Sequence, residues 1–379
     1  MSENILQETS AENMIYLVRC FIHNTVPDRK KTEKMDLTAL YTTAKKHMLT
    51  AIICTALEQA GIKDNHFIQA KAKAIRKEIV LEQDKALLSE RLEQEKIWYM
   101  PLKGMVMKEF YPSLGMRQMS DVDILFDSHY RNKVIAIMEE LGFTGTDLGR
   151  GNHDVFYKKP ISNFEMHTLL FSDTSDNNFY EYYRDVRKRL VKDEDSEYGY
   201  HFSPEDFYIY LIAHEYRHYC SSGTGLRSVL DNYVFWQKFG DTLDTAYITK
   251  ETEKLHIADF ERCNRQLALH LFGDGELDKE AEKMLSYILS SGVHGTLSQK
   301  VANDVQKNGG GRKGKIVFLF RRLFIPMETV RLYYPFFYRH KILLPFLFFI
   351  RIGRLFTVSR KKTWNTLRTL RQKIGRAHV

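Results

Sequence analysis

Two aspartates, Asp121 and Asp123, flank a single apolar residue in a short apolar run that ends at Phe126. In an extended strand alternate side chains share a face, so these carboxylates would project together while Val122 and Ile124 point into the core. Carboxylate oxygens are the ligands that Mg²⁺ prefers, and paired metals activate an attacking oxygen and neutralise a phosphate leaving group. The pair therefore predicts phosphoryl or nucleotidyl transfer, with a solvated strand end as the alternative for an isolated Asp-x-Asp.

The residues upstream of this pair add a candidate phosphate site. An apolar run over residues 97–102 predicts a strand, and Lys103 and Gly104 follow it directly. A glycine at a strand-to-helix turn lets backbone N–H groups approach an anion, and the helix N-terminus adds a favourable dipole. We expect a triphosphate at this turn, with Lys103 and Arg117 compensating its charge. The alternative for these two cations is a surface lysine and a loop arginine without a ligand.

A third acidic residue, Glu165, lies in a second candidate strand over residues 162–169. Phe164 and Met166 would face one side of that strand, while Glu165 and His167 would face the other. If this strand neighbours the first, Glu165 becomes the third carboxylate of the site. An edge strand with an exposed polar face is the alternative.

At these residues the chain resembles the uncharacterised bacterial branch of the DNA polymerase beta-like nucleotidyltransferase superfamily. The resemblance covers roughly residues 35 to 240 and rests on Lys103-Gly104, Arg117, Asp121-Val122-Asp123-Ile124-Leu125, Glu165-Met166-His167, Ala44-Lys45-Lys46-His47, His214, His218 and Leu226-Arg227-Ser228-Val229-Leu230-Asp231. The wider superfamily has a Gly-Ser or Gly-Gly pair closer to the first aspartate. Here Met105 follows Gly104 and the gap to Asp121 is long, which leaves the mode of triphosphate binding open.

The resemblance implies an α+β fold, a nucleotidyltransferase-like mixed β-sheet flanked by helices, with helical N-terminal and C-terminal regions. It also implies transfer of a nucleoside monophosphate from an NTP, ATP being the first candidate, to an unknown acceptor with release of pyrophosphate. Asp121 and Asp123 would hold two Mg²⁺ ions, with Mn²⁺ as an alternative, and Glu165 would be a third ligand or the general base. The candidates for nucleotide binding are Lys103, Gly104, Arg117, Ser120, His167, His214, Arg227 and Asp231.

Two other functions remain open. A nucleotide-binding regulatory or antitoxin-like module would keep the fold and bind a partner without turnover. A zinc metalloprotease is the second, because His214 and His218 with Glu215 spell H-E-x-x-H, in which two histidines bind zinc and the glutamate is the base. In the extended form of that motif a glycine and a third histidine follow, and here Ser221 and Thr224 occupy their positions.

The length and composition set further limits. With 379 residues, of which 44% are hydrophobic, the chain is long enough for two or three domains with a sizeable core. The four cysteines lack C-x-x-C spacing, so we expect buried free thiols in a reducing compartment. Acidic residues in the first twenty positions argue against a signal peptide, and the expected location is the cytoplasm.

Charge is unevenly distributed along the chain. Residues 307–379 contain 18 Lys and Arg against one acid, a net charge of +17, which leaves residues 1–306 at −9. The glycines of residues 308–315 predict a flexible linker ahead of this basic, aromatic-rich tail. The longest uncharged run, residues 342–350, is too short to cross a bilayer, so the alternatives are peripheral membrane association, packing on the acidic body, or nucleic-acid binding.

The pattern of periodicities divides the chain into four predicted blocks. These are a helical region over residues 1–95, a nucleotidyltransferase core over 96–175, a helical domain over 176–306 and the tail over 307–379. Strands are predicted near residues 97–102, 121–126, 153–158 and 162–169, and a helix over 129–141 is ended by Gly142. Residues 373–379 match the translation of a sequencing adapter and are excluded from the fold.

Overall fold

The computed structural model describes residues 2–146, 148–149, 151–172, 177–356, 364–366 and 369–370. The chain forms two compact units, one made of residues 1–214 and 225–285 and the other of residues 215–224 and 286–379. Residues 373–379, which match the translation of a sequencing adapter, lie outside the described residues. The division into four blocks stays a prediction.

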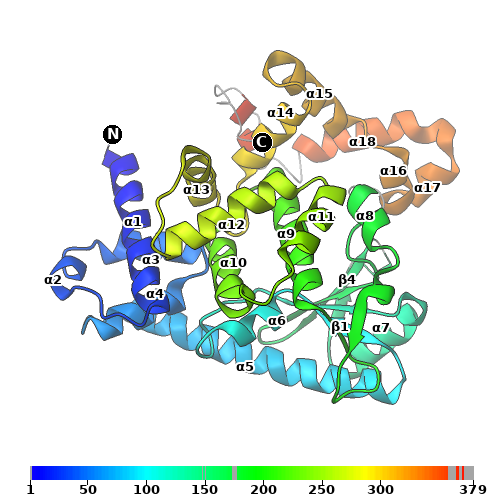
Figure 1. The fold of residues 1–379 in the computed structure, drawn as a ribbon. Helices are drawn as coiled ribbons and strands as arrows, with labels where there is room; N and C mark the ends of the chain where they lie inside the picture. Colours follow the sequence, from blue (N-terminus) through cyan, green and yellow to red (C-terminus); the bar gives the residue numbers. More distant parts are fainter. Residues whose placement is uncertain are drawn as a thin grey trace. The chain divides into compact units, whose positions relative to one another are not determined.

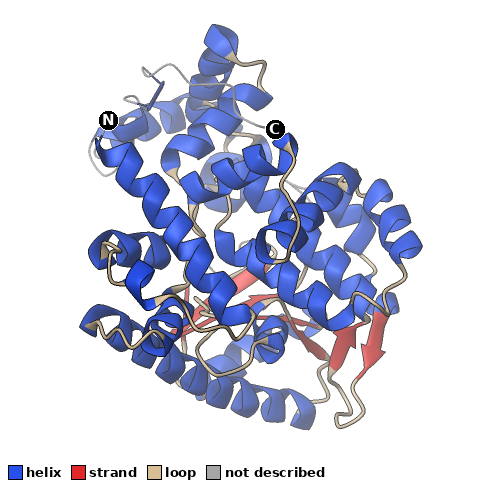
Figure 2. Cartoon of the chain, turned by 60° about the vertical axis from the view of Figure 1, so that its left-hand side comes forward, coloured by secondary structure: helices blue, strands red, loops and turns tan. Residues whose placement is uncertain are grey.

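The centre of the first unit is a mixed five-stranded sheet in the order β1-β2-β5-β4-β3. The strands are β1 (Tyr99–Pro101), β2 (Val122–Phe126), β3 (Thr144–Thr146), β4 (His153–Lys158) and β5 (Ser162–His167). Strand β2 pairs in parallel with β5, and the other pairs of neighbours are antiparallel. Figure 2 shows these strands gathered within an otherwise helical chain. The predicted mixed sheet flanked by helices is confirmed, as are all four predicted strands.

Two helices cover one face of this sheet. Helix α5 (Asn65–Gln94) begins at an N-cap, Asp64, whose carboxylate accepts the N–H groups of His66 and Phe67 at 2.9 and 3.1 Å. Its leucines and the apolar residues of α7 (Arg131–Glu140) form one core with the inward side chains of the strands. Helix α5 runs along the sheet in Figure 1. The residues of β2 and β5 that face these helices are apolar: Val122, Ile124, Phe126, Phe164 and Met166. The opposite face of these strands is therefore left for polar residues.

The first unit contains further helices before and after the sheet. Before α5 come α1 (Ser2–Ile22), α2 (Arg29–Thr32), α3 (Leu37–Lys46) and α4 (Thr50–Gln59), and after β1 come α6 (Gly104–Met107) and the 3₁₀ turn η1 (Lys108–Phe110). After the sheet come α8 (Asn177–Tyr183), α9 (Pro204–Ser221), α10 (Leu226–Phe239), α11 (Thr245–Lys254), α12 (Ala258–Phe272) and α13 (Lys279–Ser291). The last turns of α9 and α13 belong to the second unit. A two-stranded hairpin, β6 (Leu190–Lys192) with β7 (Tyr200–Phe202), was not predicted.

The second unit is helical throughout its described residues. Its elements beyond α13 are α14 (Leu297–Lys307), α15 (Gly311–Leu323), α16 (Met327–Tyr333), α17 (Pro335–Arg339), η4 (Lys341–Leu343) and α18 (Leu344–Phe356). The predicted flexible linker is wrong, because α14 and α15 pack against each other across a short turn. Gly314 makes this packing close, since a Cβ there would lie 2.1 Å from the carbonyl oxygen of Val305.

The basic tail carries exposed apolar side chains, among them Ile342, Phe346 and Phe349. None of the helices in the described part of the chain is long and apolar enough to span a membrane. Peripheral membrane association of this tail stays a prediction. All four cysteines are free thiols, as expected, although only Cys20 and Cys54 are fully buried.

Candidate nucleotidyl transfer site

Three carboxylates lie on the polar face of the sheet. Asp123 of β2 stands directly beside Glu165 of β5 in the parallel register, and Asp121 precedes β2 by one residue. Because the apolar residues between them turn towards α5 and α7, all three acids project from the other face. The structure therefore places Glu165 beside the Asp pair, and its role as a third ligand or general base stays a prediction.

Asp123 is buried and makes two charged contacts. Its Oδ1 lies 2.8 Å from Nζ of Lys103 and 2.9 Å from Nε2 of His167. Burial alone would raise the pKa of Asp123, but the Lys103 charge and the His167 hydrogen bond outweigh it and hold that pKa well below its usual range. Asp123 is thus an anion held between two donors.

Asp121 has the opposite electrostatic character. Burial, together with the neighbouring charges of Asp123 and Glu165, raises the pKa of Asp121 to about 6. Lys103 and Arg227 act in the other direction without compensating it. An ionised Asp121 is therefore short of positive charge at close range, and a cation beside it would relieve the repulsion among the three carboxylates.

Two histidines stand next to Glu165. Nε2 of His167 is 3.6 Å and Nε2 of His153 is 3.7 Å from Oε2 of Glu165. Glu165, His153 and His167 form a candidate metal-binding group. Among the described residues, their potential ligand atoms all lie within 4.8 Å of one another. The hydrogen bond from His167 lowers the pKa of Glu165, which keeps it ionised at neutral pH.

His153 is a site residue that the sequence analysis missed. It belongs to β4, which pairs antiparallel with β5 so that His153 stands opposite His167. The signal was the short connection over residues 159–161 between two predicted strands, which fixes a hairpin register and puts these two positions side by side. His167 was assigned to nucleotide binding, and here it bridges Asp123 and Glu165.

Lys103 occupies the predicted turn after β1 in an unusual backbone conformation. Its φ is +42°, a region that side-chain-bearing residues seldom adopt and that costs on the order of 1–3 kcal/mol. Besides Asp123, its Nζ lies 3.2 Å from Nε2 of His214. Burial lowers the pKa of Lys103, but the Asp123 charge outweighs burial and raises it. The ammonium group of Lys103 is thus held beside Asp123 by an ion pair.

Gly104 opens helix α6, as predicted, but that helix has only four residues. The reason for a glycine is packing, because a Cβ would lie 2.8 Å from Nη1 of Arg117 and 3.1 Å from Sδ of Met119. Triphosphate binding by this turn stays a prediction.

Arg117 and Asp231 form a separate buried ion pair. The guanidinium donates from Nε and Nη2 to the two carboxylate oxygens at 2.9 and 2.8 Å, and Oη of Tyr111 donates to Oδ1 at 2.8 Å. Burial lowers the pKa of Arg117, but Asp231 outweighs burial and raises it. Both residues were predicted to bind nucleotide, and their observed contacts are with each other. A nucleotide would reach Arg117 only through its remaining nitrogen.

The other two candidates, Ser120 and Arg227, lie at the entrance to β2. The carbonyl oxygen of Ser120 accepts from Nζ of Lys77 at 2.6 Å, and Nη1 of Arg227 donates to the carbonyl oxygen of Gln118 at 2.7 Å. Burial and the nearby Arg117 lower the pKa of Arg227. Both residues hold the chain segment that leads into Asp121, and direct contact with a nucleotide stays a prediction.

The H-E-x-x-H motif lies on helix α9, as predicted. Nε2 of His214 accepts from Lys103, and His214, Glu215 and His218 are not among the groups of close ligand atoms found in the described residues. The zinc protease stays a prediction, without a close group of ligand atoms at this motif in the described residues.

Fold and site define a mixed-sheet protein with carboxylates aligned across two parallel strands. The model of a family described as uncharacterised nucleotidyltransferase matches residues 33–273, and the chain belongs to this family. No curated protein matches the chain. A solved structure, described as an antigenic nucleotidyltransferase-like protein from Paracoccidioides brasiliensis, is 13% identical with a TM-score of 0.34; the match covers 52% of this chain and 94% of that one. The wider superfamily and the bacterial source stay predictions.

Proposed function

We propose that the protein is a divalent-metal-dependent nucleotidyltransferase that moves a nucleoside monophosphate from an NTP to an acceptor and releases pyrophosphate. The observation that carries this proposal is the alignment of Asp121, Asp123 and Glu165 on one face of two parallel strands. Family membership supports the reaction class. ATP is the first donor to test, and the acceptor is not specified by any motif.

The carboxylates offer oxygen ligands to a divalent cation. Asp121 and Glu165 present carboxylate oxygens, Asp123 has a second oxygen besides the one that Lys103 and His167 contact, and Lys103 and Arg227 compensate the charge of Asp121 only in part. Among the described residues, the ligand atoms that already lie within 4.8 Å of one another belong to Glu165, His153 and His167, and not to the two aspartates. Mg²⁺ suits such a set of oxygens, and Mn²⁺ is the alternative. When bound, the metal would supply Lewis-acid stabilisation of the α-phosphate and of the attacking oxygen.

The chain's own residues would prepare the site for transfer. Lys103, fixed at 2.8 Å from Asp123, holds positive charge at the carboxylate edge and is placed to offset charge that develops on the phosphate. Glu165, ionised at neutral pH, would accept the proton of the acceptor hydroxyl. His167 would orient both Asp123 and Glu165 through its contacts with each.

A non-catalytic nucleotide-binding module is the second candidate. The observation in its favour is that Oδ1 of Asp123 already contacts Lys103 and His167, which leaves that oxygen less available to a metal. Such a module would bind an NTP and keep it intact.

The test is transfer of α-labelled NTP by purified full-length protein into a host cell extract with Mg²⁺. We expect label in a discrete species with wild type and none with the Asp121→Asn, Asp123→Asn double variant. Asp127→Asn, at the far end of β2, is the matched control and should keep activity. The thermal unfolding of each variant is measured alongside, because Asp123→Asn removes the charge partner of Lys103.

The outcomes separate the two candidates. Equal labelling by wild type and the double variant, or none with any of the four nucleotides, would overturn the transferase. In that case, calorimetry with each NTP decides the second candidate: binding that the double variant loses supports the module, and no binding rejects both.

A further inference from the structure

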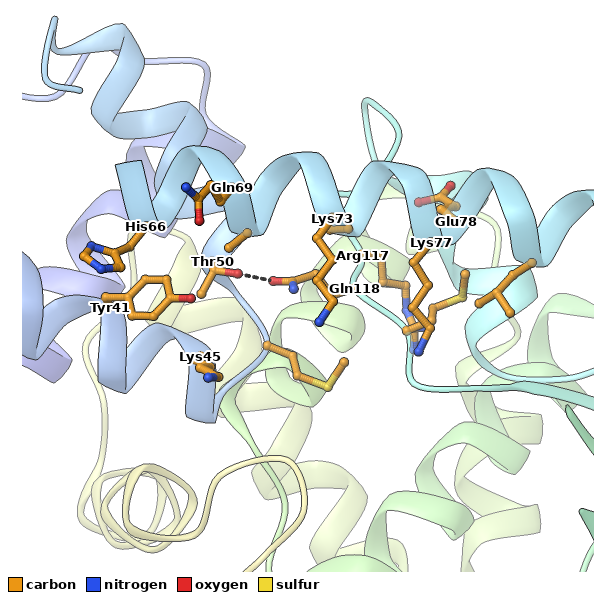
Figure 3. A pocket seen from close by; sticks show the side chains of 15 residues that line it. Tyr41, Lys45, Thr50, His66, Gln69, Lys73, Lys77, Glu78, Arg117 and Gln118 are labelled. Atoms are coloured by element: carbon orange, nitrogen blue, oxygen red, sulfur yellow. Dashed lines mark hydrogen bonds between the residues drawn. The ribbon is translucent and has the colours of Figure 1, made fainter. Parts of the chain in front are cut away.

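A cavity of about 330 Å³ lies in the first unit, outside the carboxylate site. Helices α3 and α5 and the segment 117–119 form its walls, and Figure 3 shows the side chains that line it. Its floor includes Gln118, whose Oε1 accepts from Oγ1 of Thr50 at 3.0 Å. A hydrogen bond therefore joins the wall of the cavity at Thr50 to the segment that leads into Asp121.

The lining carries an excess of positive charge. Lys45, Lys73 and Lys77 all border the cavity. Lys45 and Lys73 are exposed at the rim and Lys77 is half-buried, and among the residues that the structure describes the ammonium groups of Lys45 and Lys73 have no ion-pair or hydrogen-bond partner. The one acid of the lining, Glu78, is used elsewhere: its Oε2 accepts from the N–H of Gly115 at 2.7 Å, and its Oε1 is 3.8 Å from Nζ of Lys108. An anion in the cavity would meet uncompensated cations.

One end of the cavity is aromatic. The rings of Tyr41 and His66 lie with centroids 5.6 Å apart, and Phe67 holds Tyr41 from behind in an edge contact at 5.2 Å. Figure 3 places Tyr41 and His66 at the opposite end from Lys77. The cavity thus offers cations along its length and two tilted, partly polar rings at one end, which suits a phosphorylated molecule better than a bare inorganic ion.

Lys77 connects this cavity to the carboxylate site. Its Nζ donates to the carbonyl oxygen of Ser120 at 2.6 Å, and Ser120 directly precedes Asp121. Arg117, Gln118 and Met119, which border the cavity, belong to the same segment. A phosphate bound at Lys77 would therefore contact the segment that carries the first carboxylate.

We propose that this cavity binds a phosphate-bearing substrate of the enzyme through Lys45, Lys73 and Lys77. Two sources share this chemistry: the β- and γ-phosphates of the donor NTP, and a phosphate on the acceptor. The link to transfer rests on the proposed function, whereas binding in the cavity does not. The three lysines lie on different turns of helices α3 and α5, and each ammonium group would bind a phosphate oxygen as a point charge.

The experiment is calorimetric titration of full-length protein with inorganic tripolyphosphate in the absence of divalent metal. We expect the Lys45→Ala, Lys73→Ala double variant to bind about tenfold more weakly than wild type or worse, because each lysine contributes a charge-assisted contact. Lys63→Ala, Arg76→Ala, which removes two exposed cations outside the lining, is the matched control and should bind as wild type does. No binding by wild type, equal binding by the cavity variant, or equal loss in the control would each overturn the proposal.

A second pair of titrations identifies the source. If ATP binding weakens in the cavity variant together with tripolyphosphate binding, the cavity holds the donor's phosphates. If tripolyphosphate binding weakens while ATP binding does not, the cavity belongs to the acceptor. Asp121→Asn is included throughout: tripolyphosphate binding that survives in this variant while transfer is absent from wild type would retain the cavity and reject the transferase.

Discussion

The first unit contains two buried ionic clusters, one around Arg117 and the other around Asp123, and they differ in how completely their charges are matched. In the cluster of Arg117, Asp231 and Tyr111, one carboxylate receives two guanidinium hydrogen bonds and one hydroxyl hydrogen bond. In the cluster around Asp123, three carboxylates share Lys103 and two histidines, and the pKa of Asp121 rises to about 6.

This difference indicates which cluster builds the fold and which one is available for ligands. A buried pair whose carboxylate already accepts three hydrogen bonds leaves a ligand only the one remaining nitrogen of Arg117, and loss of either partner leaves a buried charge unpaired. A cluster with surplus carboxylates favours the uptake of a cation or a proton, as in sites that bind metals. Residue type alone does not distinguish them, since both clusters combine Asp with a cation.

The largest effect is expected from Asp231→Asn, which keeps the shape of the side chain and removes its charge. Arg117 would remain buried without its partner, so the free energy of unfolding should fall by about 3–5 kcal/mol. Urea denaturation measures this loss. A change below 1 kcal/mol would mean that the cluster of Arg117, Asp231 and Tyr111 does not stabilise the fold, and the proposed difference between the two clusters would be wrong.

Asp121→Asn should give the opposite result. Transfer activity is expected to fall by about 100-fold or more, because the substitution removes a charged ligand from the proposed metal site. Stability without divalent metal should stay the same or rise, since one of three repelling carboxylates is gone. Labelled-nucleotide transfer and urea denaturation of the same preparation test both halves, and a strongly destabilised variant would contradict the assignment of Asp121 to a ligand-binding role.

Gly104→Ala tests the boundary between the two clusters. The added Cβ would approach Nη1 of Arg117 and Sδ of Met119 more closely than ordinary contacts allow. We expect a loss of about 1–3 kcal/mol in the free energy of unfolding, as for other overpacked sites. Thermal or urea unfolding measures it; wild-type stability would show that Arg117 is free to move, and the matched cluster would then be less rigid than its hydrogen bonds indicate.

The histidines beside Glu165 allow a test of metal preference in the cluster around Asp123. Imidazole nitrogens favour later transition metals over Mg²⁺, so wild type should bind Co²⁺ more tightly than Mg²⁺. His153→Ala is expected to weaken Co²⁺ binding roughly tenfold and to leave Mg²⁺ binding nearly unchanged. Calorimetry gives the affinities and the visible spectrum of Co²⁺ reports nitrogen ligation. Equal loss for both metals would indicate a damaged fold instead.

The smallest effect is expected at an exposed ion pair. Arg29 and Glu33 are one turn apart on the surface, with Nε and Oε1 separated by 2.8 Å. Arg29→Ala should change the free energy of unfolding by less than about 0.5 kcal/mol, because water and salt screen such pairs. The same urea series used for Asp231→Asn measures it, and a loss above 1 kcal/mol would show that burial is not what separates strong from weak pairs here.

The strands and the carboxylate trio were predictable because they depend on local patterns. Alternation of apolar and polar residues identified β2 and β5 and assigned Asp123 and Glu165 to one face. The hairpin of β6 and β7 escaped prediction because each strand has three residues and polar neighbours, too few to establish a period.

The contacts that could not be predicted join distant parts of the chain. Arg117 and Asp231 are more than a hundred residues apart, and only the packing of α10 near the segment before β2 brings them together. The same applies to Lys45 and Lys73, which come from separate helices and read as solvated charges in the sequence. Charge alone does not indicate which cations face a cavity.

Helix α5 has a mechanical consequence. Its thirty residues form a single element roughly 45 Å long, with Lys73 and Lys77 on the cavity wall and Leu81, Leu88 and Leu92 packed under the sheet. An unbroken helix transmits displacement from one end to the other, so a tilt of about 5° would move one end by about 4 Å relative to the other. The cavity wall and the support of the strands that carry Asp123 and Glu165 therefore belong to one continuous helix.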